Sequence, residues 1–485
     1  MKAKYLGLLF LSGCMPDKAV VDPDSYAPAT SHAVWKKPSK SEEKAPIINE
    51  DIPLSLAEIV DIALRLNPST KLTWAQARFA AAQYGIAQAP DFPEIGSTYS
   101  YSRSRSFSSP SSTSTTTGTG AASTSTTAGS AVAAPTKFYS SQWGPQLQLT
   151  YTLLDFGQTR NSILAAKQAL YEADFTHNRE IQTVIQTVSD DYYNLLFQRA
   201  QLKAFEADLE TAQTSFDAAQ LGLDAGVKDL SDLLQAKTQL LQIQIDITSQ
   251  RQNIVVAQSQ LLTDMGLSSH QAIQVEEIPA IPSLDKMTEN ADVLLAIAME
   301  KRQDLLAAEA AVKSQEANVD LARSQFYPTV GYSLNYGQTN FGKFGKDHCD
   351  WQSSFTLSFP IFSGFSMINN LKAAKAKQAQ AEAQYRQTQL TVIQDITTAH
   401  SGVRTTFDNL KVTDELLSVS RQEYDVALAR YKAGVGNILE LMSAQSSLAD
   451  ARSTQVQGIR DWLTSLVQLS FAAGTLEPPY MKEVN

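Results

Sequence analysis

The second half of this 485-residue chain repeats the first half in register. A shift of about 235 positions lays residues 56–101 over residues 291–336 without a gap. Farther along, a shift of about 208 positions lays Ala225-Gly226-Val227 over Ala433-Gly434-Val435. A repeat of roughly 200 residues is too long for one unit of a solenoid and indicates a duplicated module. The chain is therefore expected to present its functional elements twice, with pseudo-twofold symmetry.

The charge balance argues against nucleic acid as a partner. Charged residues make up 19% of the chain, and the formal net charge is −10. The sequence has no basic patch suited to a phosphate backbone, which a nucleic-acid-binding protein needs.

Residues 1–13 have the features of a secretion signal that is removed at a lipid-modified cysteine. Two lysines precede a short apolar run, and Leu11-Ser12-Gly13-Cys14 matches the lipobox pattern. The run is too short to span a bilayer of about 30 Å, so it is expected to be a signal peptide rather than an anchor. Acyl chains on Cys14 would tether residues 14–52 to a membrane leaflet, and Met15 in place of an aspartate indicates the outer membrane. The alternative is a cysteine that happens to follow an ordinary secretion signal.

Four segments alternate apolar and polar residues with a period of two, which predicts β-strands. They cover residues 95–105, 142–154, 329–340 and 352–362. Each is about ten residues long, the length that a tilted strand needs to cross a bilayer. Residues 106–136, between the first two strands, are almost wholly Ser, Thr, Ala and Gly, and we expect a flexible loop at a strand tip. The setting favours membrane-spanning strands, and a half-buried sheet of a soluble domain is the alternative.

A very long helix is predicted after the second strand of each repeat. Apolar residues recur at spacings of three and four from residue 158 to about residue 223. Such a helix would measure roughly 95–100 Å at a rise of 1.5 Å per residue. Gly226 and Gly434 would end the two long helices in a left-handed turn, after which a second helix runs back. The domains expected from these patterns are a first repeat at 53–275, a second repeat at 276–476 and a C-terminal tail at 477–485.

Four strands cannot cross a membrane alone. An open sheet leaves two edges of unpaired backbone groups, which hydrocarbon cannot satisfy. The smallest outer-membrane barrels use about eight strands, so each chain is expected to contribute its four strands to a shared barrel. Two chains would give a barrel filled with side chains, and three would give one wide enough for a lumen.

The residues around the second glycine turn carry a family resemblance. They read Ala429-Arg430-Tyr431-Lys432-Ala433-Gly434-Val435, followed by Ile438-Leu439-Glu440-Leu441 and Ala444-Gln445. Tyr327-Pro328 before the third strand and Leu154-Asp155-Phe156-Gly157 after the second also fit. With these motifs the chain resembles the TolC-like outer-membrane efflux proteins from about Leu54 to Leu476. Its lipobox makes it most similar to their acylated, OprM-like branch.

The resemblance implies a mixed α and β fold class and a trimer. Long antiparallel coiled-coil helices would form a periplasmic helical barrel, and four transmembrane β-strands per chain would complete a trimeric 12-stranded β-barrel in the outer membrane. The implied function is that of an exit duct in a tripartite efflux or type I secretion system. The implied assembly is a homotrimer. Its implied partners are a periplasmic adaptor protein, an inner-membrane pump and outer-membrane lipid.

The resemblance also implies a gate at the periplasmic end of the helices. Arg430 and Tyr431 match a pair that links neighbouring helices in the family, and Asp232 matches an acidic partner in the first repeat. Glu440 lies where some members carry an aspartate, whereas Ser443 stands where an acidic residue is often found. Around a threefold axis such carboxylates would form rings that attract cations. The alternative is that Asp232 and Glu440 are solvated side chains that complement a helix dipole.

The sequence offers no catalytic constellation, so neither an enzyme nor a cofactor is expected. The five histidines are scattered without metal-ligand spacing. The adjacent residues His348, Cys349 and Asp350 could suggest copper or zinc, but sequence neighbours rarely converge on one ion. A second functional hypothesis is a structural envelope lipoprotein whose coiled coils conduct nothing. The four amphipathic strands argue against it, because a scaffold does not need them.

Overall fold

The structure is a computed structural model that describes residues 30, 53–108, 136–269, 273–276, 291–341 and 348–478. The predicted signal peptide, Cys14, most of the predicted tether and most of the Ser/Thr-rich loop lie outside the described residues. So does the C-terminal tail from residue 479 onward.

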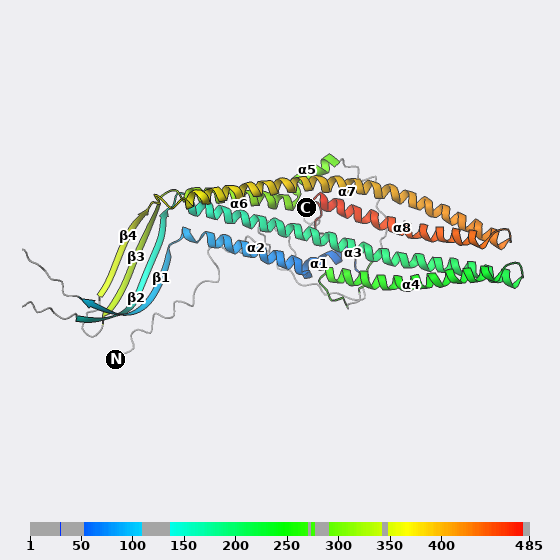
Figure 1. The fold of residues 1–485 in the computed structure, drawn as a ribbon, viewed down its shortest axis with the longest axis horizontal. Helices are drawn as coiled ribbons and strands as arrows, with labels where there is room; N and C mark the ends of the chain where they lie inside the picture. The colour runs from blue at the N-terminus through cyan, green and yellow to red at the C-terminus, as the bar shows by residue number, and fades with distance from the viewer. Residues whose placement is uncertain are drawn as a thin grey trace, which may run out of the picture. The chain divides into compact units, whose positions relative to one another are not determined.

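The chain forms two repeats of the same element order (Figure 1). The first repeat contains α1 (Leu56–Leu66), α2 (Pro68–Ala87), the 3₁₀ turn η3 (Ala89–Asp91), β1 (Glu94–Ser108), β2 (Thr136–Leu154), α3 (Gln158–Asp224) and α4 (Leu230–Asp264). The second contains α5 (Ala291–Lys301), α6 (Gln303–Ser324), β3 (Thr329–Phe341), β4 (His348–Ser358), α7 (Ser366–Lys432) and α8 (Ile438–Ala472). The duplicated module predicted from the sequence is therefore a duplicated set of helices and strands.

The compact units of the structure cut across the two repeats. One unit, the helical unit, comprises the described residues of Met1–Ile86, Leu164–Ala317 and Ala374–Asn485. The other, the strand unit, comprises those of Ala87–Ile163 and Asn318–Ala373. Both repeats contribute to both units, so neither repeat is a separate compact domain. None of the helices in the described ranges combines the length and the apolar character needed to span a lipid bilayer.

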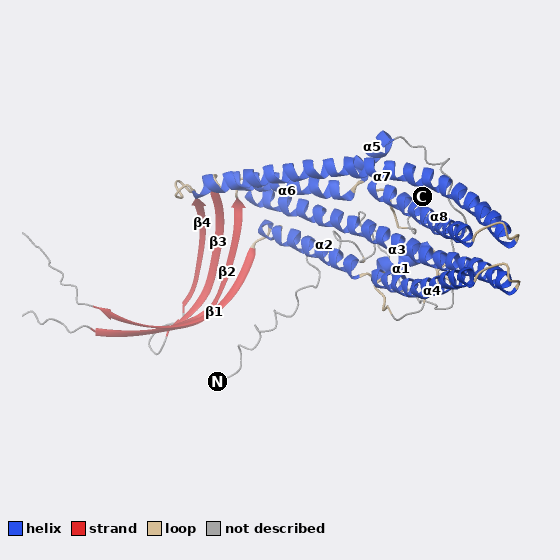
Figure 2. Ribbon diagram, turned by 45° about the vertical axis from the view of Figure 1, so that its right-hand side comes forward, coloured by secondary structure: helices blue, strands red, loops and turns tan. Residues whose placement is uncertain are grey.

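The strand unit is built on one antiparallel sheet in the order β1-β2-β3-β4 (Figure 2). The outer strands β1 and β4 each have only one neighbour among the described residues. Cross-strand partners lie on the same face of a sheet. Ile95 pairs with Leu149, and Leu147 pairs with Tyr336. The register therefore gathers the apolar positions of all four strands on one face.

This apolar face is exposed. Tyr99 on β1 is 71% exposed, and Trp351 and Phe355 on β4 are 73% and 72% exposed. The opposite face carries Gln148 and Asn335, which are cross-strand partners, together with other amides and hydroxyls. The alternation predicted from the sequence is confirmed, with the apolar side uncovered.

The fourth strand was placed too far along the chain by the sequence pattern. We expected it at 352–362, whereas β4 runs from His348 to Ser358. The apolar alternation continues through Phe359 and Ile361, but Pro360 lies between them and has no amide hydrogen to donate to a ladder. The hydrophobic period therefore outlasts the strand.

The helical unit contains most of two hairpins, α3–α4 and α7–α8. The long helices α3 and α7 have 67 residues each, and the returning helices α4 and α8 have 35 each. Figures 1 and 2 show both hairpin turns at the same end of this unit. The long helices predicted from the heptad pattern are confirmed without a break.

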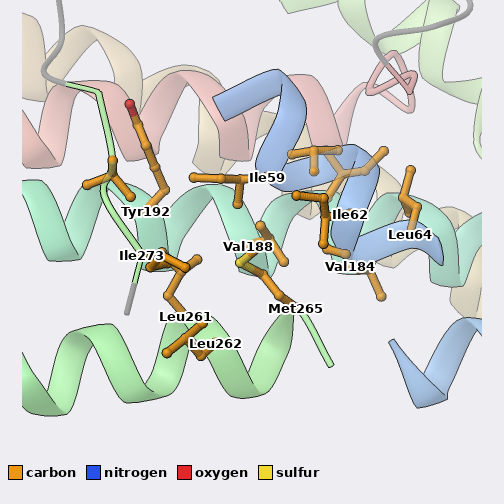
Figure 3. Close-up of a cluster of buried hydrophobic side chains, with 14 of the residues drawn as sticks. Ile59, Ile62, Leu64, Val184, Val188, Tyr192, Leu261, Leu262, Met265 and Ile273 are labelled. Carbon is orange, nitrogen blue, oxygen red and sulfur yellow. The ribbon is translucent and has the colours of Figure 1, made fainter. Parts of the chain in front are cut away.

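The first repeat has its own apolar core. α1 begins at a capping box, in which the Ser55 hydroxyl accepts from the Glu58 amide and the Glu58 carboxylate accepts from the Ser55 amide. Its buried face packs on α3 and α4 (Figure 3). The labelled core residues are Ile59, Ile62, Leu64, Val184, Val188, Tyr192, Leu261, Leu262, Met265 and Ile273. A bridge between Leu54 and Val275 then joins the two ends of this repeat.

The second repeat has a separate core around Trp462, which is fully buried against Phe407. Ile396 and Val403 of α7 and Leu463 of α8 belong to the same cluster. Ile393, three residues before Ile396 on α7, is 38% exposed and lies outside the cluster.

Candidate functional site

The two hairpin turns adopt the conformation that the sequence predicts. Gly226 has φ +70° and Gly434 has φ +75°, in the left-handed region where a side chain is strained. The Gly226 amide donates to the Leu223 carbonyl at 2.9 Å, and the Gly434 amide donates to the Tyr431 carbonyl at 3.0 Å. These bonds satisfy carbonyls that the helix ends would leave unpaired.

A third apolar cluster holds the two turns together. It takes Ala219 and Ala236 from the first hairpin and Ile438 and Leu441 from the second. Tyr431 belongs to it and is only 2% exposed. The predicted gate residue Tyr431 is therefore part of the packing between the hairpins.

Tyr431 reaches across to the first hairpin. Its hydroxyl donates to Oδ2 of Asp232 at 3.1 Å. Burial raises the pKa of Tyr431, and the Asp232 carboxylate raises it further. The phenol therefore stays protonated at neutral pH, so that it can serve as a donor to the carboxylate.

Arg430 and Glu440 form a second pair, within the second hairpin. Nη1 of Arg430 lies 2.8 Å from Oε1 of Glu440, and both side chains are about half exposed. Of the four predicted gate residues, only Tyr431 and Asp232 connect the two hairpins. Ser443 is exposed, and because it is a serine the second hairpin has no carboxylate at that position.

The sequence reasoning missed Lys228, which lies in the first turn. Its Nζ donates to the Gly436 carbonyl of the second turn at 3.1 Å. The same Nζ lies 4.3 Å from the centre of the Tyr431 ring. Its position beside the glycine turn was the only signal that could have pointed to it.

The sequence reasoning also missed a buried charge network elsewhere in the helical unit. Arg302, between α5 and α6, is 2% exposed. Its guanidinium donates to Asp304 at 2.6 Å and to Asp395 of α7 at 2.9 Å. Arg179 of α3 donates to the carbonyl of Phe471 at 3.2 Å and lies over its ring. These contacts connect α3, α6, α7 and α8 and give this region a structural rather than a chemical role.

Within the described residues, no group of three or more His, Cys, Asp or Glu side chains is placed to hold a metal ion. Cys349 is exposed and is not in a disulfide. The arrangement at the turns offers hydrogen bonds and ion pairs that can form and break. It is suited to holding helices together rather than to chemistry.

Comparison with known proteins places this chain in a family. The chain belongs to the outer membrane efflux protein family, whose model matches residues 59–267 and 294–475.

The relatives span most of the chain. Protein CyaE of Bordetella pertussis is 25% identical over 426 residues, which cover 87% of this chain and 84% of CyaE. The probable efflux pump outer membrane protein TtgC of Pseudomonas putida is 25% identical over 350 residues, 69% of each chain. The solved structure of the outer membrane protein VceC from Vibrio cholerae is similar with a TM-score of 0.71 and 21% identity. That match covers 86% of this chain and 96% of VceC, and it shows the shared fold.

Proposed function

We propose that this chain is one subunit of an outer-membrane exit duct that serves an efflux or type I secretion system. Membership of the outer membrane efflux protein family supports the class of function. The observation that carries the proposal is the exposed apolar face of a four-stranded sheet in the same chain as two long helical hairpins. An envelope scaffold would need the hairpins but would have no use for such a sheet.

The duct is a homotrimer. The sheet has edges at β1 and β4 that need partner strands, because unpaired backbone groups are costly in hydrocarbon. Three copies close a 12-stranded barrel with the apolar face toward lipid and the amide-rich face toward a lumen. Acylation of Cys14 would anchor the mature N-terminus in the same membrane.

The hairpin turns form the periplasmic gate. Tyr431 and Asp232 tie the two hairpins of one subunit together, so the aperture can widen only when this hydrogen bond breaks. The Arg430–Glu440 pair braces the second hairpin at the same end. A shallow groove lined by Leu234, Leu439 and Met442 lies beside the turns and supplies a surface for a periplasmic adaptor, which would couple the duct to an inner-membrane pump.

The gate is tested by single-channel recording in planar bilayers with the Asp232→Ala/Glu440→Ala double variant. Loss of the acceptor of Tyr431 and of the partner of Arg430 should raise the open fraction severalfold. Loss of two carboxylates per subunit should also lower the preference for cations. The control is Glu382→Ala/Glu415→Ala, which removes the same charge from exposed positions on α7.

Unchanged conductance and selectivity in the double variant would remove Asp232 and Glu440 from the gate. The duct itself is tested by the mass of the detergent-extracted particle, corrected for bound detergent. About three chain masses supports the trimer. A monomer without conductance would favour the structural lipoprotein instead.

A further inference from the structure

We infer that Lys228 is a positioning residue that holds Tyr431 in the closed gate. Tyr431 contacts two residues of the first hairpin that are four positions apart. Its hydroxyl bonds to Asp232, and its ring lies under the Lys228 ammonium group. The inference rests on the proposed gate and adds a second contact that holds the same side chain.

Lys228 makes its two contacts to the second hairpin with one atom. Nζ donates to the Gly436 carbonyl at 3.1 Å and lies 4.3 Å from the Tyr431 ring centre. A cation within about 6 Å of a ring centre is attracted by the negative face of the ring, more strongly where water is excluded. Tyr431 is almost fully buried and the Lys228 hydrogen bond to Gly436 is part-buried, so this contact is partly shielded from bulk solvent.

The stem of Lys228 is held in place by its own turn. A Cβ placed on Gly222 would lie 2.6 Å from Cγ of Lys228 and 3.2 Å from its Cβ. Gly222 therefore leaves the space that the lysine stem occupies. The amide of Lys228 also donates to the Gly222 carbonyl at 3.1 Å. The stem of Lys228 therefore packs against its own turn while its ammonium group reaches the second turn.

The arrangement also balances charge where the two hairpins meet. The Asp232 carboxylate accepts from a neutral phenol, so its negative charge is not cancelled by Tyr431 itself. Lys228 is a cation that lies over the same ring. Breaking the Tyr431–Asp232 hydrogen bond alone leaves the ring held by Lys228, and opening requires both contacts to part.

Lys228→Met tests this role in the full trimer. Methionine keeps an apolar stem but removes the cation and the donor, so the open fraction in planar bilayers should rise about five- to tenfold. Lys228→Arg restores a cation and a donor and should bring the channel back toward the wild-type open fraction. Lys237→Met on α4 is the matched control, because that lysine is exposed and its loss changes the charge equally.

A second variant keeps the test decisive if Lys228→Met fails to assemble. Lys228→Gln retains a donor for the Gly436 carbonyl without the charge, and it should open the channel less than methionine but more than arginine. A wild-type open fraction in Lys228→Met, measured beside a clearly opened Asp232→Ala variant, would overturn the role of Lys228 while the gate stands. No conductance in any variant or in the wild type would instead overturn the proposed duct, and this inference with it.

Discussion

The two helical hairpins have the same helix lengths but different side chains at their turns. α3 matches α7 in length and α4 matches α8, yet the first turn supplies Lys228 and Asp232 while the second supplies Arg430 and Tyr431. At the positions of Arg430 and Tyr431, the first repeat carries Gly222 and Leu223. Duplication thus preserved the helix lengths and the turn geometry. The contacts between the turns arose where the copies diverged.

The close approach within each turn shows this divergence in detail. The first turn pairs Gly222 with Lys228, and the second pairs Arg430 with Gly436 at the equivalent positions. Each turn therefore has one glycine and one long side chain, in opposite order. Each turn has room for one long side chain at these two positions. The first repeat places it at the second position, as Lys228, and the second repeat places it at the first, as Arg430.

The largest expected change in stability comes from a buried ion pair between α3 and α8, which has no counterpart at the equivalent positions of α4 and α7. Arg452 pairs with Asp208, which is 3% exposed, whereas the equivalent residues Gln244 and Leu416 form no ion pair. Arg452→Ala should lower the free energy of unfolding by about 3–5 kcal/mol, because it leaves a buried carboxylate unpaired. Thermal unfolding followed by circular dichroism measures the loss, with Gln244→Ala as the control. If Asp208→Leu/Arg452→Met is as unstable as Arg452→Ala, the unpaired charge is not the cause.

A pH-dependent change in stability, of intermediate size, is expected from a buried carboxyl of the first hairpin. Asp174 on α3 is fully buried, and neither of its carboxylate oxygens has a hydrogen-bond partner. It lies one turn from His177 and Asn178, which contact Thr73 of α2 and Gln303 of α6. Burial raises the pKa of Asp174 from 3.8 to about 8. The folded protein therefore keeps a proton that the unfolded chain releases, and its stability falls as pH rises from about 4 to 8.

Asp174→Asn removes the part of this pH dependence that Asp174 contributes; Asp190 and Asp191 on α3, whose pKa values burial also raises, keep theirs in both proteins. The variant should match the wild type near pH 4 and gain roughly 2–4 kcal/mol of stability over it by pH 7. Glu382 occupies the equivalent position on α7 and is exposed, so Glu382→Gln should change little at either pH. A constant difference between Asp174→Asn and the wild type across this range would refute the buried, protonated carboxyl.

The smallest expected difference in stability is between alanine substitutions of Gly436 and Gly222. A Cβ on Gly436 would lie 2.9 Å from the Tyr431 amide nitrogen and 3.0 Å from the Arg430 carbonyl carbon, which are backbone atoms. Gly436→Ala should therefore cost about 1–3 kcal/mol and disturb the second turn. Gly222→Ala meets only the flexible stem of Lys228 and should cost less. Equal unfolding midpoints for the two variants would show that the backbone gives way as readily as the lysine.

Much of the fold follows from the sequence because it is periodic. The heptad spacing and the glycine turns predict both long helices and their ends, and the shift of about 208 positions reproduces their boundaries. The strands follow from alternation, but their bounds differ. β2 begins at Thr136 and β4 at His348, before the predicted starts at 142 and 352, and Pro360 follows the end of β4 while the apolar pattern continues. Periodicity describes each element separately and says nothing of which side chains meet across elements.

The candidate site was predictable only in part for the same reason. Asp232, Arg430, Tyr431 and Glu440 came from family resemblance, and their pairing needed coordinates. Lys228 makes its contacts with residues about 200 positions away, and no local pattern marks it. Arg302 was missed likewise, since its partner Asp395 is 93 positions distant.

The separate cores of the two repeats have a consequence for biogenesis. Nearly all side chains of the first core lie between Leu54 and Val275, and the bridge between these two residues joins the ends of that stretch. A chain exported from its N-terminus can therefore bury this core while the second repeat is still crossing the inner membrane. In the proposed trimer, the sheet would be the last part to find its partners, because β3 and β4 emerge later and the edges at β1 and β4 would pair with other subunits. Assembly of the proposed trimer would then be limited by strand pairing between chains, after each chain has already folded its first helices.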